Sequence, residues 1–164
     1  MAAGSTYTPI ATTTLTSAAS SITFSSISGS YTDLIVIANG KTVTDNAGYW
    51  LRVNNDSASN YSYTILRGNG TSALSSRGSN QTELPIGFYS SNDQNDTLMV
   101  NLNNYSNSST YKTLLVRGNI TKYDVEATVG LWRSTSAINR VDVICASGNL
   151  ASGFTATIYG ITAA

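Results

Sequence analysis

The side chains that could do chemistry in this chain are few, and histidine is absent altogether. Histidine is the side chain best suited to moving protons near neutral pH and is the commonest metal ligand, so its absence excludes Ser-His-Asp triads and most zinc sites. The two glutamates, Glu83 and Glu126, could form the acid pair of a glycan-cleaving enzyme. Glu83 follows a polar loop, however, and Glu126 falls on the polar side of an alternating pattern, so both are expected to be solvated acids. The chain is therefore predicted not to be an enzyme.

Neither the single cysteine nor the Asn/Asp-rich segment 54–60 indicates a metal or redox site. Cys145 shares the period-2 face of Val141 and Val143, which predicts a buried small hydrophobe, and a lone cysteine cannot form an intrachain disulfide. The segment holds one carboxylate, Asp56, and lacks the dense aspartate spacing of an EF-hand loop. A turn stabilised by Asx hydrogen bonds is expected there, and no metal or cofactor is expected.

Aromatic side chains surround this segment, and two interpretations of them stay open. Trp50, Tyr61 and Tyr63, together with Asp56, have the composition of a carbohydrate platform, on which rings stack against sugar faces beside a carboxylate. The same rings could instead pack a sandwich core or an oligomer interface, where amphipathic aromatic residues are favoured. Their spacing does not separate the two.

The elements that must position these residues are predicted to be β-strands throughout. Short runs of β-branched and aromatic residues alternate with Gly-, Asn- and Ser-rich turns about every 8–12 residues, a spacing typical of a sandwich or barrel. No window of a dozen residues has helical periodicity with caps. About ten strands are expected, over residues 21–27, 32–39, 49–54, 61–67, 82–89, 97–103, 111–117, 125–133, 138–145 and 154–161.

Alternation along the strands predicts which face of each one is buried. In the strand over 125–133, the apolar set that starts at Val125 is expected in the core, with Glu126 and Thr128 in solvent. Residues 34–37 are apolar on both faces, so Ile35 and Ile37 are expected against a neighbouring element or a partner subunit.

Composition limits the domain count and the partners. A chain of 164 residues is about one domain long, and such a domain buries roughly 70% of its unfolded surface. Charged residues make up 11%, well below the roughly 25% of ordinary domains, and the net charge is zero with scattered arginines. Binding to nucleic acid is therefore not expected. No apolar stretch approaches the ~18 residues of a membrane span, so no membrane association is expected either.

Residues 1–20 are predicted to form an extended N-terminal arm or edge strand in front of a single β-sandwich domain over 21–164. Pro9 forces its predecessor into extended geometry, and the segment is too poor in apolar residues to fold alone. Tyr7, Pro9, Ile10 and Leu15 are the expected partner-binding residues, because an extended segment can add a strand to a neighbour's sheet edge.

Several stretches of the chain, in order, resemble small structural proteins of tailed bacteriophages. The stretches are residues 7–15, 22–27 and 31–34 near the start, 52–56, 60–62 and 67–70 in the middle, and 153–161 at the end. They are strand and turn patterns, so the resemblance implies no catalytic residues.

The resemblance implies a jelly-roll sandwich acting in the virion, assembled in the cytoplasm of the host cell. Within that class we expect a capsid cement or decoration protein that binds the major capsid protein lattice, since the chain has no coiled-coil heptads and no repeated shaft. A homotrimer is expected, because closed symmetry is usual and a trimer matches local threefold positions of a shell. The alternative is a tail-fibre or tail-tip domain that binds a host receptor or surface glycan through Trp50, Asp56, Tyr61 and Tyr63.

Overall fold

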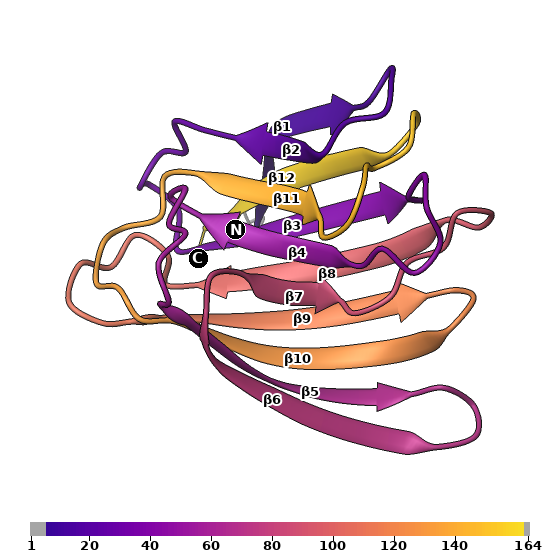
Figure 1. The fold of residues 1–164 in the computed structure, drawn as a ribbon. Coiled ribbons are helices and arrows are strands. Elements are labelled where there is room, and N and C mark those ends of the chain that lie inside the picture. The colour runs from indigo at the N-terminus through magenta and orange to yellow at the C-terminus, as the bar shows by residue number, and fades with distance from the viewer. Residues whose placement is uncertain (1–5, 163–164) are drawn as a thin grey trace.

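The chain folds as two antiparallel β-sheets packed face to face, which confirms the predicted all-β sandwich (Figure 1). The computed structural model describes residues 6–162, and this range contains no helix. The larger sheet has eight strands in the order β1 (Tyr7–Thr14), β12 (Thr155–Ile161), β3 (Asp33–Gly40), β8 (Asp96–Asn103), β9 (Lys112–Ile120), β10 (Asp124–Trp132), β5 (Tyr61–Gly68) and β6 (Ala73–Gln81). The smaller sheet has four, in the order β2 (Ser21–Phe24), β11 (Val141–Cys145), β4 (Tyr49–Val53) and β7 (Leu84–Gly87).

Each of the ten expected strands overlaps one strand of the structure, and the two further strands are β1 and β6. The sequence left open whether the first segment is an arm or an edge strand, and the structure places β1 at the edge of the larger sheet against β12. Strand β6 was missed because its side chains are exposed on both faces. A Ser-rich strand with no buried face has no hydrophobic alternation to reveal it.

The chain passes repeatedly between the two sheets. Neighbouring strands of the smaller sheet, such as β2 and β11 or β4 and β7, are far apart in sequence. Among the twelve strands of residues 6–162, only β5–β6 and β8–β9–β10 are consecutive strands that pair directly. Such crossing connections are typical of sandwiches with Greek-key topology. The jelly-roll subclass stays a prediction.

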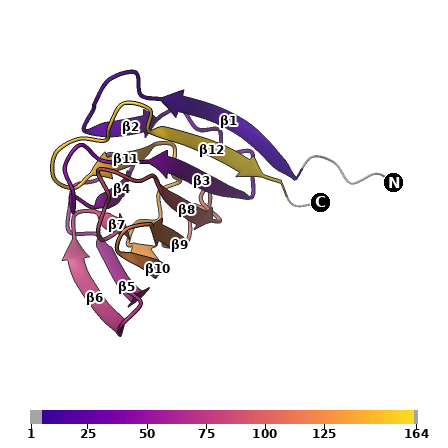
Figure 2. The ribbon, with the colours of Figure 1, turned by 90° about the vertical axis from the view of Figure 1, so that its right-hand side faces the viewer.

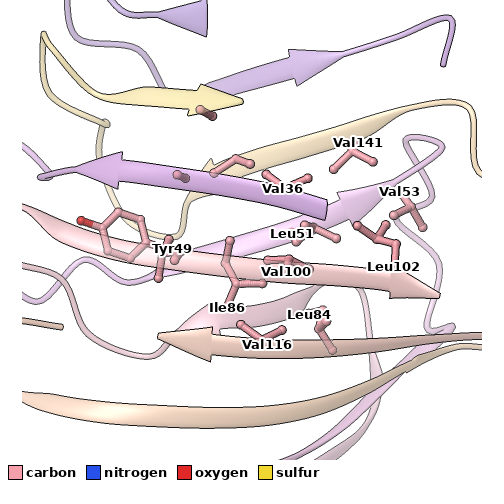
Figure 3. Close-up of a cluster of buried hydrophobic side chains, with 14 of the residues drawn as sticks. Val36, Tyr49, Leu51, Val53, Leu84, Ile86, Val100, Leu102, Val116 and Val141 are labelled. Atoms are coloured by element: carbon pink, nitrogen blue, oxygen red, sulfur yellow. The ribbon is translucent and has the colours of Figure 1, made fainter. Parts of the chain in front are cut away.

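The hydrophobic core lies between the sheets, where the inner faces of β4, β7 and β11 meet those of β3, β8 and β9 (Figure 3). Tyr49, Leu51, Val100 and Val141 are each fully buried there. The core is off centre, because β7 is the last strand of the smaller sheet, while the larger sheet continues through β10 and β5 to β6. The β5–β6 hairpin therefore extends past the smaller sheet (Figures 1 and 2).

Residues 6–162 hold no helix long and apolar enough to cross a membrane. Cys145 is 5% exposed, which confirms that it is a buried residue, and burial raises the pKa of its thiol.

Candidate interaction surface

Strand β10 turns its apolar side chains to solvent and its polar ones to the core, the reverse of the orientation predicted from the sequence. Glu126 and Thr128 are 2% and 3% exposed, whereas Val125 and Val129 are 63% and 53% exposed. Gly130 belongs to the inward set, and its place shows why: a Cβ atom there would lie 2.4 Å from Leu84 of β7. Position 130 on the inward face therefore has room for a glycine but not for a valine or leucine, which the other register would place inward.

The buried carboxylates of Glu126 and Asp124 interact with groups from distant parts of the chain. Its two oxygens accept hydrogen bonds from the backbone N–H of Phe88, at 2.9 and 3.0 Å. Asp124, two residues earlier on the same face, forms an ion pair with Arg67 of β5 at 3.4 Å. Arg67 also lies over the ring of Phe88, with its guanidinium carbon 5.0 Å from the ring centroid. Two acids and one base are thus enclosed beneath β10.

Burial, together with this imbalance of charge, raises the pKa values of both acids. Burial raises the pKa of Glu126 to about 7, and the Asp124 charge adds to the shift while the Phe88 N–H opposes it. Burial also raises the pKa of Asp124. The Oδ1 atom of Asp124 is buried and has no hydrogen-bond donor among the described residues. A carboxyl proton on Glu126, shared with Asp124, would supply that donor and leave one negative charge for Arg67 to balance.

The outer face of the larger sheet carries the aliphatic side chains that β10 turns outward. Paired residues on neighbouring strands share a face: Val129 lies beside Leu115 of β9, and Ala127 lies beside Leu66 of β5. Leu66 is 62% exposed and Leu115 is 46% exposed. Several of these side chains line a groove of about 470 Å³. We call the outward side chains of β1, β12, β3, β8, β9, β10, β5 and β6 the outer face.

The outer face continues across the whole sheet with few charges. Between Leu115 and the β12 side of the sheet it passes Asn101 and Ile35, and threonine pairs join β12 to the edge strand. Ile35 is only 5% exposed, so side chains of its own chain cover it. This agrees with the expectation that it packs against a neighbouring element. Among the described residues of these eight strands, the charged side chains on the outer face are Asp33, Arg77 and Arg117.

The outer face is large enough for a stable interface. Eight strands about 4.8 Å apart, each about eight residues long at about 3.3 Å per residue, cover about 38 by 26 Å, or about 1,000 Å². A stable interface of ordinary size buries about 800 Å² on each partner. Within this area the exposed aliphatic side chains Leu66, Leu115, Val125 and Val129 lie over β5, β9 and β10, and an apolar patch of this kind marks an interaction site.

The four residues of the predicted carbohydrate platform do not come together. Tyr61 is fully buried, and its hydroxyl bonds to the backbone of Val53, as expected for a core residue. Tyr63 is half-buried and packs edge-on against Phe88 inside the sandwich. Trp50 is half-buried on β4, where it pairs with Ile144 and Pro85.

The carboxylate of Asp56 is occupied within the chain. It accepts hydrogen bonds from Trp132 Nε1 at 2.7 Å, from Asn60 Nδ2 at 2.8 Å and from the Ala58 N–H at 2.9 Å. Burial opposes the shift, but the bonds from Asn60 and Trp132 hold the pKa of Asp56 below its usual value. Segment 54–60 is thus a turn built on Asx hydrogen bonds, as the sequence predicted. Among the described residues no three acidic or cysteine side chains form a group that could hold a metal ion.

The predicted partner-binding residues of the first segment divide into two pairs. Tyr7 is 55% exposed and Pro9 is exposed on the edge strand. Ile10 and Leu15 are half-buried against the hydrophobic core, and the Leu15 N–H bonds to the Phe154 carbonyl at 2.9 Å. Residues 7–15 are thus part of the sandwich, because Leu15 and β1 pack on it, and the expected arm within 1–20 is revised accordingly. Residues 1–5 lie outside the described residues.

Comparisons with known proteins assign no family to the chain. No family model matches it, and no curated protein matches it. Among solved structures, an exo-inulinase from Aspergillus awamori is similar, with a TM-score of 0.40 and 12% identity. The similarity covers 94% of this chain and 29% of the exo-inulinase chain. A mutant of the alginate lyase Aly36B, in complex with alginate tetrasaccharide, is similar at a TM-score of 0.29 and 7% identity, with 82% of this chain and 72% of that one covered. At these scores neither likeness bears on the function of the chain.

Proposed function

We propose that this chain is a structural protein of a tailed-bacteriophage particle, which acts through contacts with copies of itself and with the shell rather than through catalysis. The observation that carries the proposal is the outer face, a nearly uncharged surface of interface size with an apolar patch over β5, β9 and β10. The resemblance of the chain to phage structural proteins supplies the kind of particle.

We assign the outer face to self-association. A second copy suits it because few charges would have to lose their water on contact, and removing charge from water is the main cost of burying a polar surface. The net charge of zero means that copies do not repel one another over longer distances. The proposed oligomer is a trimer, since closed rotational symmetry is usual for homo-oligomers.

Within the particle, the proposed role is that of a capsid cement or decoration protein. A trimer at a local threefold position of the shell would bridge neighbouring copies of the major capsid protein and add contact area at their joints. The exposed residues of the edge strand, Tyr7 and Pro9, are the proposed contacts to the lattice. The proposed location is the virion.

Self-association is tested by placing charge on the outer face. Leu115→Glu and Val125→Glu each put a carboxylate on the outer face, and Val43→Glu is a matched control on an exposed valine of the β3–β4 connection. Sedimentation velocity at micromolar concentration should show an oligomer for the wild type and for the control and a monomer for the two outer-face variants. A monomeric wild type would refute this part of the proposal.

The location in the particle is tested by labelling. Immunogold electron microscopy of purified particles should show the chain spread over the shell. Labelling confined to the tail would refute the cement role and favour the tail-fibre or tail-tip alternative. Absence from purified particles would refute the virion proposal as a whole.

A further inference from the structure

One end of the sandwich is built from four connections that meet. They are residues 41–48 between β3 and β4, residues 88–95 between β7 and β8, the turn 121–123 between β9 and β10, and the turn 69–72 between β5 and β6. They come from distant parts of the sequence, and two aspartates tie three of them together. Ligand sites of sandwich proteins commonly lie in loops grouped at one end of the sheets.

Asp96, at the start of β8, holds this end from inside. Its Oδ2 atom accepts hydrogen bonds from the Tyr49 hydroxyl at 2.9 Å and the Ser91 N–H at 2.8 Å, and its Oδ1 atom accepts one from the Thr121 N–H at 3.0 Å. Asp45 holds it from outside, because it accepts hydrogen bonds from Lys122 Nζ at 2.8 Å and from the Tyr123 hydroxyl. Three of the four connections are thus fixed in place before any ligand arrives, which lowers the entropic cost of binding.

A pocket of about 410 Å³ lies among these connections, within the usual range of small-molecule sites. Tyr89 and Tyr123 line it, with ring centroids 5.5 Å apart and planes inclined at 43°. Both rings are half-buried, so each still presents part of its surface. Arg67 lies over the Tyr89 ring, with its guanidinium carbon 4.9 Å from the centroid.

Two asparagines that line the pocket, on different connections, have side-chain groups that no described residue occupies. Asn46 makes no side-chain hydrogen bond to any described residue, and its backbone has a φ of 61°, a conformation that asparagine and glycine tolerate best. The Oδ1 atom of Asn69 accepts three hydrogen bonds from Thr71 and Ser72, which orients the amide and leaves its NH₂ group as a donor. The pocket thus offers one oriented amide, that of Asn69, and one uncommitted amide, that of Asn46.

The cations around the pocket are already paired with carboxylates of the chain. Lys122 lies between Asp45 and Asp93, at 2.8 and 3.8 Å, and Asp124 is paired with Arg67. An anionic ligand would find no uncommitted cation there, and a metal ion would find no cluster of carboxylates among the described residues. A neutral ligand rich in hydroxyl groups matches the aromatic surfaces and the amides.

We propose that this pocket, defined by Asn46, Asn69, Tyr89 and Tyr123, binds one unit of a neutral saccharide. The apolar face of the sugar lies against the tyrosine rings, and its hydroxyls bond to the two amides. The site lies apart from the four residues in which the sequence suggested a carbohydrate platform, and it does not depend on self-association through the outer face.

The test is a titration of ¹⁵N-labelled protein with the methyl glycosides of glucose, galactose, mannose, rhamnose and N-acetylglucosamine, followed by amide NMR. At least one of these should shift the amide signals of Tyr89 and Tyr123, with a dissociation constant of about 1 mM. If none of them shifts these signals, the proposal is wrong.

Variants assign the binding to this pocket. Tyr89→Ala removes a ring, and Asn46→Gly removes an amide while keeping a residue that accepts the positive φ; each should weaken binding about tenfold or more. Tyr111→Ala, an exposed tyrosine at the other end of β9, is the control and should bind like the wild type. Unchanged affinity in Asn46→Gly and Tyr89→Ala would overturn the proposal. The outer-face variant Leu115→Glu should still bind the saccharide. The binding test can therefore be interpreted even if the self-association proposal fails.

Discussion

Replacing Glu126 by glutamine should stabilise the protein at alkaline pH. Glutamine has the shape of a protonated glutamate and is neutral at every pH. Its amide oxygen can accept the hydrogen bond from the Phe88 N–H, and its NH₂ group can donate to the Oδ1 atom of Asp124, which otherwise lacks a donor. The variant therefore reproduces the state in which residue 126 is neutral and Asp124 is paired with Arg67, and position 126 no longer titrates.

The magnitude follows from the shift in pKa. The pKa of Glu126 rises from an ordinary value of 4.5 to about 7 in the folded protein, so the folded state binds the proton more tightly than the unfolded state. The stability that this proton contributes is fully present below pH 4.5 and is lost as pH rises through 7. At about 1.4 kcal/mol per pKa unit the loss is about 3 kcal/mol. For a chain of this size that corresponds to about 6–12 °C in Tm.

Urea unfolding at several pH values between about 5 and 8, followed by tryptophan fluorescence at one protein concentration, measures this loss. The free energy of unfolding of the wild type should fall as pH rises over this range. Glu126→Gln should lack that slope and exceed the wild type by about 3 kcal/mol at the alkaline end. Glu83→Gln, which removes the charge of a half-buried glutamate paired with Arg52, is the control and should keep the wild-type slope. A Glu126→Gln variant with the wild-type slope would refute the assignment of the slope to this carboxyl.

Three further predictions concern the core and the edge of the larger sheet. Cys145→Ala should lower the free energy of unfolding by about 1 kcal/mol and leave the oligomeric state unchanged, and rapid labelling of the native thiol by a bulky reagent would contradict its burial. Gly130→Ala should cost about 1–3 kcal/mol in urea unfolding, because the new methyl group overlaps the fully buried Leu84; a variant as stable as the wild type would show that this inward position has spare room. Deletion of residues 1–15 should lower Tm measured by circular dichroism, since it removes β1 and Leu15 and uncovers β12. An unchanged Tm would mean that β1 adds no stability.

Most strands could be located from the sequence because the signals for them are local. A strand over 97–103 shows itself by alternation, and the connections around it show themselves by Gly, Asn and Ser. The burial of Cys145 could be predicted for the same reason, since Val141 and Val143 share its face. Strand β6 gave no such signal: its position depends on pairing with β5, and both of its faces meet solvent.

Two parts of the candidate sites were beyond the sequence. The carbohydrate platform failed because Tyr61 and Tyr63 point into the sandwich, whereas Trp50 lies in the other sheet. The pocket at the end of the sandwich was not visible, because Asn46 and Tyr123 lie far apart in the chain and meet only when four connections close on one another.

The sequence by itself determined that the protein is all-β, where most of its strands lie and that no histidine chemistry is available to it, because these follow from residue types and from a period of two. Only the tertiary structure decided which face of β10 is buried. A period of two divides a strand into two faces but does not assign either face to the core. That choice depended on Leu84, which leaves room for no more than Gly130, and on Arg67 and the Phe88 N–H, which compensate the burial of Asp124 and Glu126. These groups come from β5 and the end of β7, and their positions are set by packing between strands remote in sequence.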